Sequence, residues 1–328
     1  MRILLILLTS FLAMWTMSAQ AVQIDNFYQV RERLESQEPD IRDAGLQTSM
    51  QTLIQRLTGS DKAAKGALAN YVQKPDSLYV RYGFEGNTLV VDYDQAAVDA
   101  AFQKAGVETW GDNRPLIVSW WVVDRLSGAG LLSDGRQGVG AVYQAAHYRG
   151  LAVRLPIGDL EEQAFSNARA LNDKQALLQA SAKYAAEGVL AVSAKERGLD
   201  WSGSWTFNYA GQEYKGTAKG EGIDGLAEEI FLQVNQILAP RFIVDAKSAE
   251  QLELHFHGVN LERYAQLEQW LAPFSSELVR VEGDQQVWRV RASKEQIRSQ
   301  LGLAKLREQV AKSIDGSQVP SNQLVFAW

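Results

Sequence analysis

The pattern of apolar and polar positions divides the chain into three folded units. In the first, residues 22–110, the apolar residues of 41–57 recur at i, i+3, i+4 and i+7, which predicts an amphipathic helix ending at Gly59. Two strand-like runs within 78–94 predict a hairpin, and a shorter helical stretch ends near Gly106. This order predicts an N-terminal α/β domain.

The second unit, residues 111–243, opens with the run RPLIVSWWVVDR, after a boundary segment, GVETWGDNRP, that shows no periodicity. Alternate positions of 116–123 are apolar on both faces, which is typical of a strand covered by helices on both sides. The glycine-rich stretch 128–140 matches no phosphate-binding motif, so we expect a flexible strand-to-helix loop there. A helix, the strand LAVRLP, a second helix and the strand VLAVSAKE follow.

The strand WSGSWTFNY then shows strict alternation, with aromatic residues on one face and serine, threonine and asparagine on the other. This alternation predicts a strand with one face in water. The run EYKGTAKGE predicts its partner strand, and residues 226–238 predict a long helix. The second unit is therefore expected to be a mixed-sheet domain of order β-α-β-α-β-β-β-α.

The third unit, residues 250–328, has the order βαββα(β), with its last strand expected at NQLVFAW. This order predicts a small α+β module of the ferredoxin-like or POTRA-like kind. Such modules usually bind rather than catalyse, which is an argument from fold analogy alone.

The first residues predict export. A positive charge at Arg2, an apolar run from Ile3 to Met17 and the small-x-small sequence Ala19-Gln20-Ala21 predict a signal peptide, residues 1–21, cleaved after Ala21. The apolar run is shorter than the roughly 20 residues that span a bilayer. We therefore expect a periplasmic protein with no transmembrane segment after cleavage.

Composition narrows the chemistry further. The net charge is −6, which gives the protein no electrostatic reason to bind nucleic acid. There is no cysteine, which excludes disulfides, thiolate metal sites and a lipid anchor on a cysteine. No cofactor is expected.

Carboxylates offer the best candidates for catalysis. Asp159, Glu161 and Glu162 follow the strand LAVRLP, and Asp124 ends the opening strand at the same edge if the two strands are parallel. These carboxylates are candidates for general acid and base work, for example in glycan hydrolysis, with Asp124, Asp159 and Glu161 as the three leading candidates. The alternative for residues 159–162 is helix capping in solvent.

Two aromatic residues and two histidines are weaker candidates. Trp201 and Trp205 share one strand face and are candidates for stacking against sugar rings, although burial in the core would stabilise the fold more. His255 and His257 alternate on one strand, as in a two-histidine metal clip, but the sequence identifies no third ligand. A polar strand face without metal is the alternative.

Four motifs in fixed order carry a resemblance: WGDNRPLIVSW, AAHYRGLAVRLPIGDLEE, LLQASAKYAAEGVLAV and WSGSWTF. In this order the chain resembles domain-of-unknown-function family 2066, a family of exported proteins of Gram-negative bacteria, up to about Arg241. The resemblance implies export and no particular activity. The order of elements in the second unit is also similar to envelope assembly factors such as the curli secretion protein and the lipoprotein activators of peptidoglycan synthases.

The sequence thus favours a non-enzymatic periplasmic protein that binds envelope proteins during assembly or maintenance of the cell envelope. The alternative is a peptidoglycan-binding or glycan-hydrolysing protein that uses the aromatic strand and the acidic loop.

Overall fold

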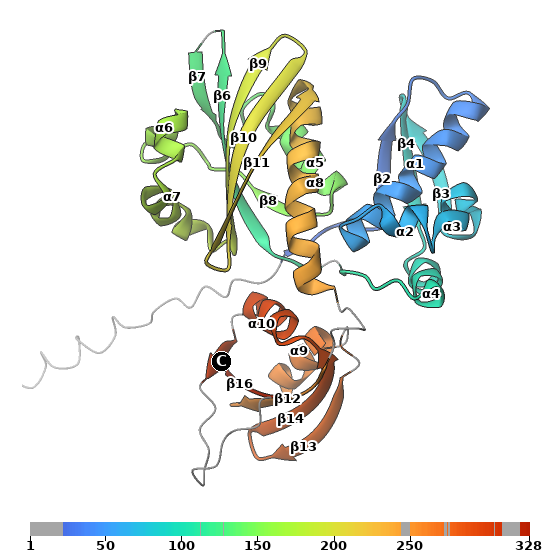
Figure 1. Cartoon of the computed structure of the whole chain (residues 1–328), viewed down its shortest axis with the longest axis vertical. Helices are drawn as coiled ribbons and strands as arrows, with labels where there is room; N and C mark the ends of the chain where they lie inside the picture. The colour runs from blue at the N-terminus through green and yellow to red at the C-terminus, as the bar shows by residue number, and fades with distance from the viewer. Residues whose placement is uncertain are drawn as a thin grey trace, which may run out of the picture.

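The computed structural model describes residues 22–111, 113–126, 128–243, 250–271, 274, 276–304, 306–309 and 322–328. The predicted signal peptide, residues 1–21, lies outside the described residues. Residues 244–249, between the predicted second and third units, also lie outside them. The predicted mixed α/β and α+β fold class is confirmed (Figure 1). In the described part of the chain, no helix combines the length and the apolar character needed to cross a membrane.

The N-terminal unit is a three-stranded antiparallel sheet packed against a long helix. The sheet order is β2-β4-β3, with β2 at Gln29–Arg33, β3 at Tyr79–Glu85 and β4 at Thr88–Tyr93. Helix α1 (Pro39–Thr58) ends at Gly59 as predicted. The remaining helices are α2 (Lys62–Lys65), α3 (Ala69–Gln73), η1 (Pro75–Ser77) and α4 (Gln95–Ala105).

Strand β2 was not predicted, because its sequence QVRER has a single strongly apolar residue. Only Val30 and Glu32 of this strand are buried, so one of its two core positions is a carboxylate. The hydrophobic alternation that reveals a strand is therefore missing.

The central unit is a six-stranded mixed sheet with helices on both faces (Figure 1). Five strands lie in the order β11-β10-β9-β6-β7, and the sixth, β8, pairs with β6. The strands are β6 (Leu116–Arg125), β7 (Gly128–Leu132), β8 (Ala152–Arg154), β9 (Gly188–Arg197), β10 (Asp200–Tyr209) and β11 (Gln212–Glu221). The helices are α5 (Val139–Tyr148), η2 (Glu162–Phe165), α6 (Ala168–Leu171), α7 (Lys174–Ser181), η3 (Ala182–Tyr184) and α8 (Gly222–Phe242).

Strand β6 is the buried centre of this sheet, as its two apolar faces predict. Trp121 packs in the core beneath α5 and α8, whereas Trp120 packs on the other face with Phe165 and Tyr184. The expected flexible loop after β6 is wrong over its first part: residues 128–132 form β7, antiparallel to β6. Glycines at 128 and 130 weaken the strand signal, because they add no side chain to the pattern.

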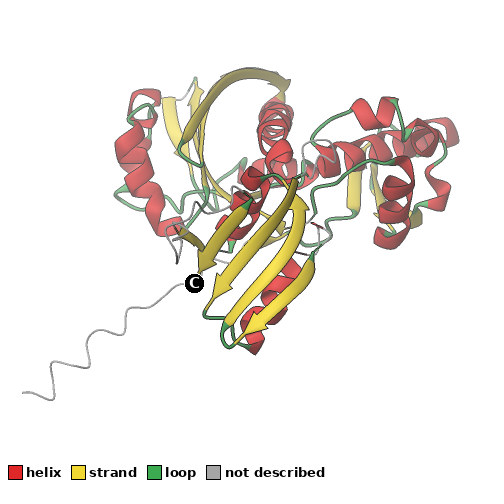
Figure 2. Ribbon diagram, turned by 60° about the horizontal axis from the view of Figure 1, so that its bottom comes forward, coloured by secondary structure: helices red, strands yellow, loops and turns green. Residues whose placement is uncertain are grey.

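The C-terminal unit has the predicted βαββα(β) order, with one further short strand. Its sheet order is β13-β14-β12-β16-β15, and the last strand is parallel to β12. One face of this sheet carries the helices and the other is open (Figure 2). The elements are β12 (Glu250–His257), α9 (Leu261–Leu271), β13 (Glu277–Glu282), β14 (Gln285–Ala292), α10 (Lys294–Leu303), β15 (Arg307–Gln309) and β16 (Gln323–Ala327).

The segment between the first two units is packed rather than exposed. Strand β5 (Asn113–Arg114) in this segment pairs antiparallel with β1 (Val22–Gln23) at the start of the N-terminal unit. The guanidinium of Arg114 is fully buried and lies 3.6 Å from the centre of the Trp110 ring. It donates to the backbone oxygens of Trp110 (2.8 Å), Arg56 (3.0 Å) and Gly111 (2.7 Å). This buried cation therefore fixes the N-terminal unit to the start of β6.

Candidate binding face on the central sheet

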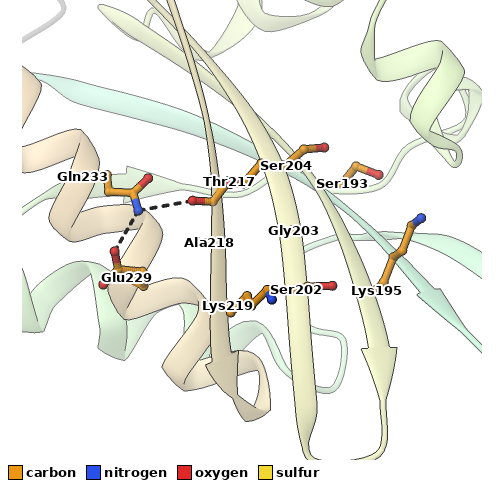
Figure 3. Close-up of a pocket in the computed structure, with 10 residues that line it drawn as sticks. All are labelled: Ser193, Lys195, Ser202, Gly203, Ser204, Thr217, Ala218, Lys219, Glu229 and Gln233. Carbon is orange, nitrogen blue, oxygen red and sulfur yellow. Dashed lines mark hydrogen bonds between the residues drawn. The ribbon is translucent and has the colours of Figure 1, made fainter.

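Half of one face of the central sheet is covered and the other half is open. Near β6, the side chains of Val118, Trp120, Val189 and Ala191 are buried under the segment 165–184. Farther along, strands β9, β10 and β11 carry polar residues with no helix above them (Figure 3). We call this open part the lysine-serine face. It comprises Ser193, Lys195, Ser202, Ser204, Thr217 and Lys219.

The strand register arranges these six side chains in two rows. Ser202 of β10 lies between Lys195 of β9 and Lys219 of β11. One row away, Ser204 lies between Ser193 and Thr217. Because neighbouring strands are about 4.8 Å apart, the two lysine backbones are about 10 Å apart. Two ammonium groups therefore flank a group of hydroxyls.

The face lines a hollow of about 640 Å³. In Figure 3 the side chains of Ser193, Lys195, Ser202 and Ser204 project to one side of the sheet. Helix α8 borders the hollow beyond β11. There the side-chain amide of Gln233 donates hydrogen bonds to Glu229 (2.7 Å) and to the Thr217 carbonyl (3.3 Å). A hollow of this volume is within the usual range of about 300–1,000 Å³ for ligand sites.

The two lysines of the face differ from other lysines nearby in having no acidic partner. Lys174 and Lys215 both pair with Glu213, at 3.1 and 2.8 Å. In contrast, Lys195 and Lys219 have no carboxylate within 4.0 Å in the described part of the chain. Their positive charge is left for an external group.

The alternation of β10 predicted that its hydroxyls form a face in water, whereas neither lysine of the face was predicted. Lys195 and Lys219 occupy alternate, outward positions on their own strands, which is a signal that the sequence does contain. Only the register of three strands shows that they flank Ser202.

The tryptophans proposed for sugar stacking lie on the opposite side of β10. Trp201 is 8% exposed and Trp205 is 5% exposed, and both belong to the core beneath α8. The indole nitrogen of Trp205 donates to Gln233 at 2.9 Å. A glycine at 216 makes room for this ring, since a Cβ there would lie 2.4 Å from it. The stacking role is therefore corrected to core packing.

The candidate carboxylates do not converge. Strand β8 is parallel to β6, which is the condition that the sequence argument set, but it pairs with residues 116–118, so its carboxyl end lies beside the first part of β6. The acidic loop lies near Leu132, which is opposite Trp121, because Asp134 donates to the Pro156 carbonyl. Asp124 is three residues, or about 10 Å, farther along β6.

Each of the three carboxylates has its own surroundings. Asp124 pairs with Arg197 at 3.8 Å and Asp159 pairs with Lys183, which holds the pKa of Asp159 below its usual range. Asp159 also accepts from the Glu162 amide at 2.9 Å, as the capping alternative predicted. Glu161 is exposed to solvent.

The buried member of the acidic loop is Glu162, which the sequence placed in the same group as Asp159 and Glu161 but not among the three leading candidates. Its carboxylate accepts from the amide of Gly158 (2.6 Å) and from the Tyr184 hydroxyl, and it pairs with Lys183 (2.8 Å). Burial, together with this bond to Glu162, raises the pKa of Tyr184 to about 12. Gly158 has a φ of +81°, and a Cβ there would lie 2.5 Å from Ser133. The cluster fixes the shape of the loop.

The histidines lie on β12, in the open face of the C-terminal sheet. His255 is 3.9 Å from Glu253, and burial lowers the pKa of its imidazole. Among the described residues, no group of three or more potential metal ligands surrounds either ring. The metal clip therefore has no third ligand in this part of the chain.

Comparison with known proteins gives a family match and a structural match. Residues 21–111 match the model of a family described as Domain of unknown function (DUF8605). The expected membership of family 2066 is wrong, because the matching model is a different one and covers the unit ahead of the motifs that suggested the resemblance. A comparison with curated proteins found no match.

Among solved structures, the chain is similar to the LpoB C-terminal domain from Salmonella enterica. The identity is 12%, and the match covers 38% of this chain and 92% of that chain, with a TM-score of 0.21. A likeness of this size carries no argument about function.

Proposed function

We propose that this protein is a non-enzymatic interaction protein, exported to the periplasm, that acts in assembly or maintenance of the cell envelope. The observation that supports binding is the lysine-serine face, where two lysines have no acidic partner among the described residues and lie beside an open hollow. Export is supported by the signal-like residues 1–21.

The arrangement of the carboxylates favours binding over acid and base catalysis. General acid and base catalysis requires groups that reach one substrate together, and their pKa values must differ in a useful way. Asp124 and Asp159 are apart along the sheet, and each is paired with a cation. The bond with Lys183 holds the pKa of Asp159 below its usual range, which leaves this carboxylate unsuited to donating a proton near neutral pH.

Two experiments test the proposal. Amino-terminal sequencing of the protein from a periplasmic fraction should find Val22 as the first residue, and an intact Met1 would contradict export by cleavage. Tagged mature protein, incubated with solubilised envelope fractions, should enrich a defined envelope protein relative to an unrelated exported protein carrying the same tag. Release of soluble fragments from isolated peptidoglycan by the purified protein would contradict the non-enzymatic assignment.

A further inference from the structure

We propose that the lysine-serine face binds an extended acidic peptide segment of a partner protein. In this arrangement Lys195 and Lys219 each form an ion pair with a carboxylate of the peptide. The hydroxyls between the two lysines form hydrogen bonds with the peptide backbone. The inference rests on the proposed function, because it assigns the partner's chemistry to a particular surface.

The charge pattern identifies the sign of the ligand. Five lysines lie on or beside this side of the sheet, and the three outside the face are already paired with Glu213, Asp159 or Glu162. The remaining two, Lys195 and Lys219, are exposed and flank the same serine. An anionic ligand supplies the missing partners.

Acidic groups limit where the ligand lies. Asp124 is opposite Lys195 in the β6–β9 register, but its carboxylate pairs with Arg197. Glu229 borders the hollow on the α8 side and accepts a bond from Gln233. Asp200 and Glu221 lie in the next row on the same side of the sheet, beyond Ser202 and Lys219. A polyanion is repelled by these acidic groups, so its carboxylates are confined to the space between the lysines.

The spacing suits an extended chain. Alternate side chains on one side of an extended peptide are about 7 Å apart, because the rise is about 3.3 Å per residue. Two lysines with backbones about 10 Å apart and long flexible stems reach carboxylates at that spacing. Strand β10 is hydrogen-bonded to strands on both sides, so its backbone amides and carbonyls already have partners. The serine hydroxyls must therefore supply the hydrogen bonds to the peptide.

The lining favours a peptide over an anionic glycan. Proteins commonly hold sugar rings against exposed aromatic side chains, and none of the described residues that line this hollow is aromatic. The nearest indoles, Trp201 and Trp205, face the core on the other side of β10. Hydroxyls, in contrast, both donate and accept, as peptide amides and carbonyls require.

The test is binding of a fluorescein-labelled oligoglutamate peptide to the purified mature protein, followed by fluorescence anisotropy at low ionic strength. We expect saturable binding that weakens as salt is added. Lys195→Gln and Lys219→Gln should each weaken binding about threefold, and the double variant about tenfold. Ser202→Ala should weaken binding without any change of charge.

The matched control is the double variant Lys62→Gln, Lys104→Gln, which removes the same charge from exposed positions of the N-terminal unit. This control should bind the peptide as the wild type does. Equal binding by the Lys195 and Lys219 double variant and the wild type would overturn the proposal. Tighter, lysine-dependent binding of oligogalacturonate would also overturn it, since the site would then be one for an anionic glycan.

Envelope capture separates this inference from the proposed function. If the Lys195 and Lys219 double variant captures the same envelope protein as the wild type, the inference is wrong and the proposed function stands. If the wild type captures no envelope protein, the proposed function is lost whatever the peptide assay shows.

Discussion

The rings of Trp110 and Phe242 are stacked, with centroids 4.6 Å apart and planes inclined by 2°. Trp110 is the last residue of the N-terminal unit, and Phe242 is the last residue of α8 in the central unit. The segment that sequence analysis treated as a domain boundary is therefore part of a core. The Arg114 guanidinium packs on the Trp110 ring and completes this junction.

Truncation of this stacked pair should destabilise the central unit. Trp110→Ala or Phe242→Ala removes a buried ring and leaves a cavity, with an expected loss of about 3–5 kcal/mol. The loss of unfolding free energy in the double variant should be smaller than the sum of the losses in the two single variants, since the rings stabilise each other by about 1 kcal/mol. Urea unfolding measures these free energies, and additive losses would contradict a direct interaction.

Arg114→Lys should loosen the junction although the charge is kept. Lysine lacks the planar fork that donates to three backbone oxygens, so buried acceptors lose their partners. We expect faster cleavage by chymotrypsin after Trp110. An exposed control substitution, Arg33→Lys, should leave the cleavage rate unchanged, and equal rates for the two variants would count against the role of Arg114.

The buried carboxylate of Glu32 should make stability depend on pH. It accepts from Thr52 (2.8 Å) and Tyr148 (3.0 Å) where β2 meets α5, and burial raises its pKa to about 7 from an ordinary value of 4.5. The folded state therefore binds this proton more tightly than the unfolded state. The stabilisation is complete below pH 4.5 and is lost as the pH rises through 7, by about 3 kcal/mol in total.

The measurement compares Glu32→Gln with the wild type across pH 4.5 to 8. The variant keeps an acceptor for Thr52 and Tyr148 but has no proton to lose at this position. As the pH rises, the unfolding free energy of the variant should therefore increase relative to that of the wild type. Glu35→Gln, at an exposed position, should follow the wild type. Parallel curves for Glu32→Gln and the wild type would contradict the raised pKa.

Glu162→Gln should loosen the acidic loop. Both carboxylate oxygens of Glu162 accept hydrogen bonds, but a glutamine side chain has only one oxygen that can accept. One of the donors around position 162 therefore loses its acceptor, and Lys183 loses a charge partner. Breaking such a buried cluster costs about 3–5 kcal/mol. Hydrogen exchange at the Gly158 amide should speed up, whereas Glu161→Gln, at an exposed position, should not alter it. Unchanged protection of Gly158 would show that the cluster does not hold the loop.

Sequence patterns predicted those elements whose side chains alternate or repeat clearly. The two apolar faces of β6 predicted that Trp120 and Trp121 pack on opposite sides, and the structure confirms this. The patterns failed where polar or small residues occupy core positions, as Glu32 does in β2 and the glycines do in β7. In these strands, partner strands rather than hydrophobic alternation determine the structure.

The candidate site was harder to predict because it depends on register between strands. The alternation of β10 predicted its wet face correctly, but the positions of Lys195 and Lys219 beside Ser202 follow from pairing with β9 and β11. The same dependence on register explains why the candidate carboxylates do not lie together. Strands β6 and β8 meet the condition of being parallel, yet the offset between them separates Asp124 from the acidic loop.

The central claim is that the protein works by binding through the lysine-serine face. It is tested most directly by photocrosslinking in cells, with p-benzoylphenylalanine placed at position 204 in the middle of the face or at Gln103 on α4 as a control. Ser204 and Gln103 are both exposed. The account predicts a discrete adduct with one envelope protein from position 204, absent from position 103 and diminished by Lys195→Gln with Lys219→Gln. No adduct from position 204, or the same adducts from both positions, would contradict it.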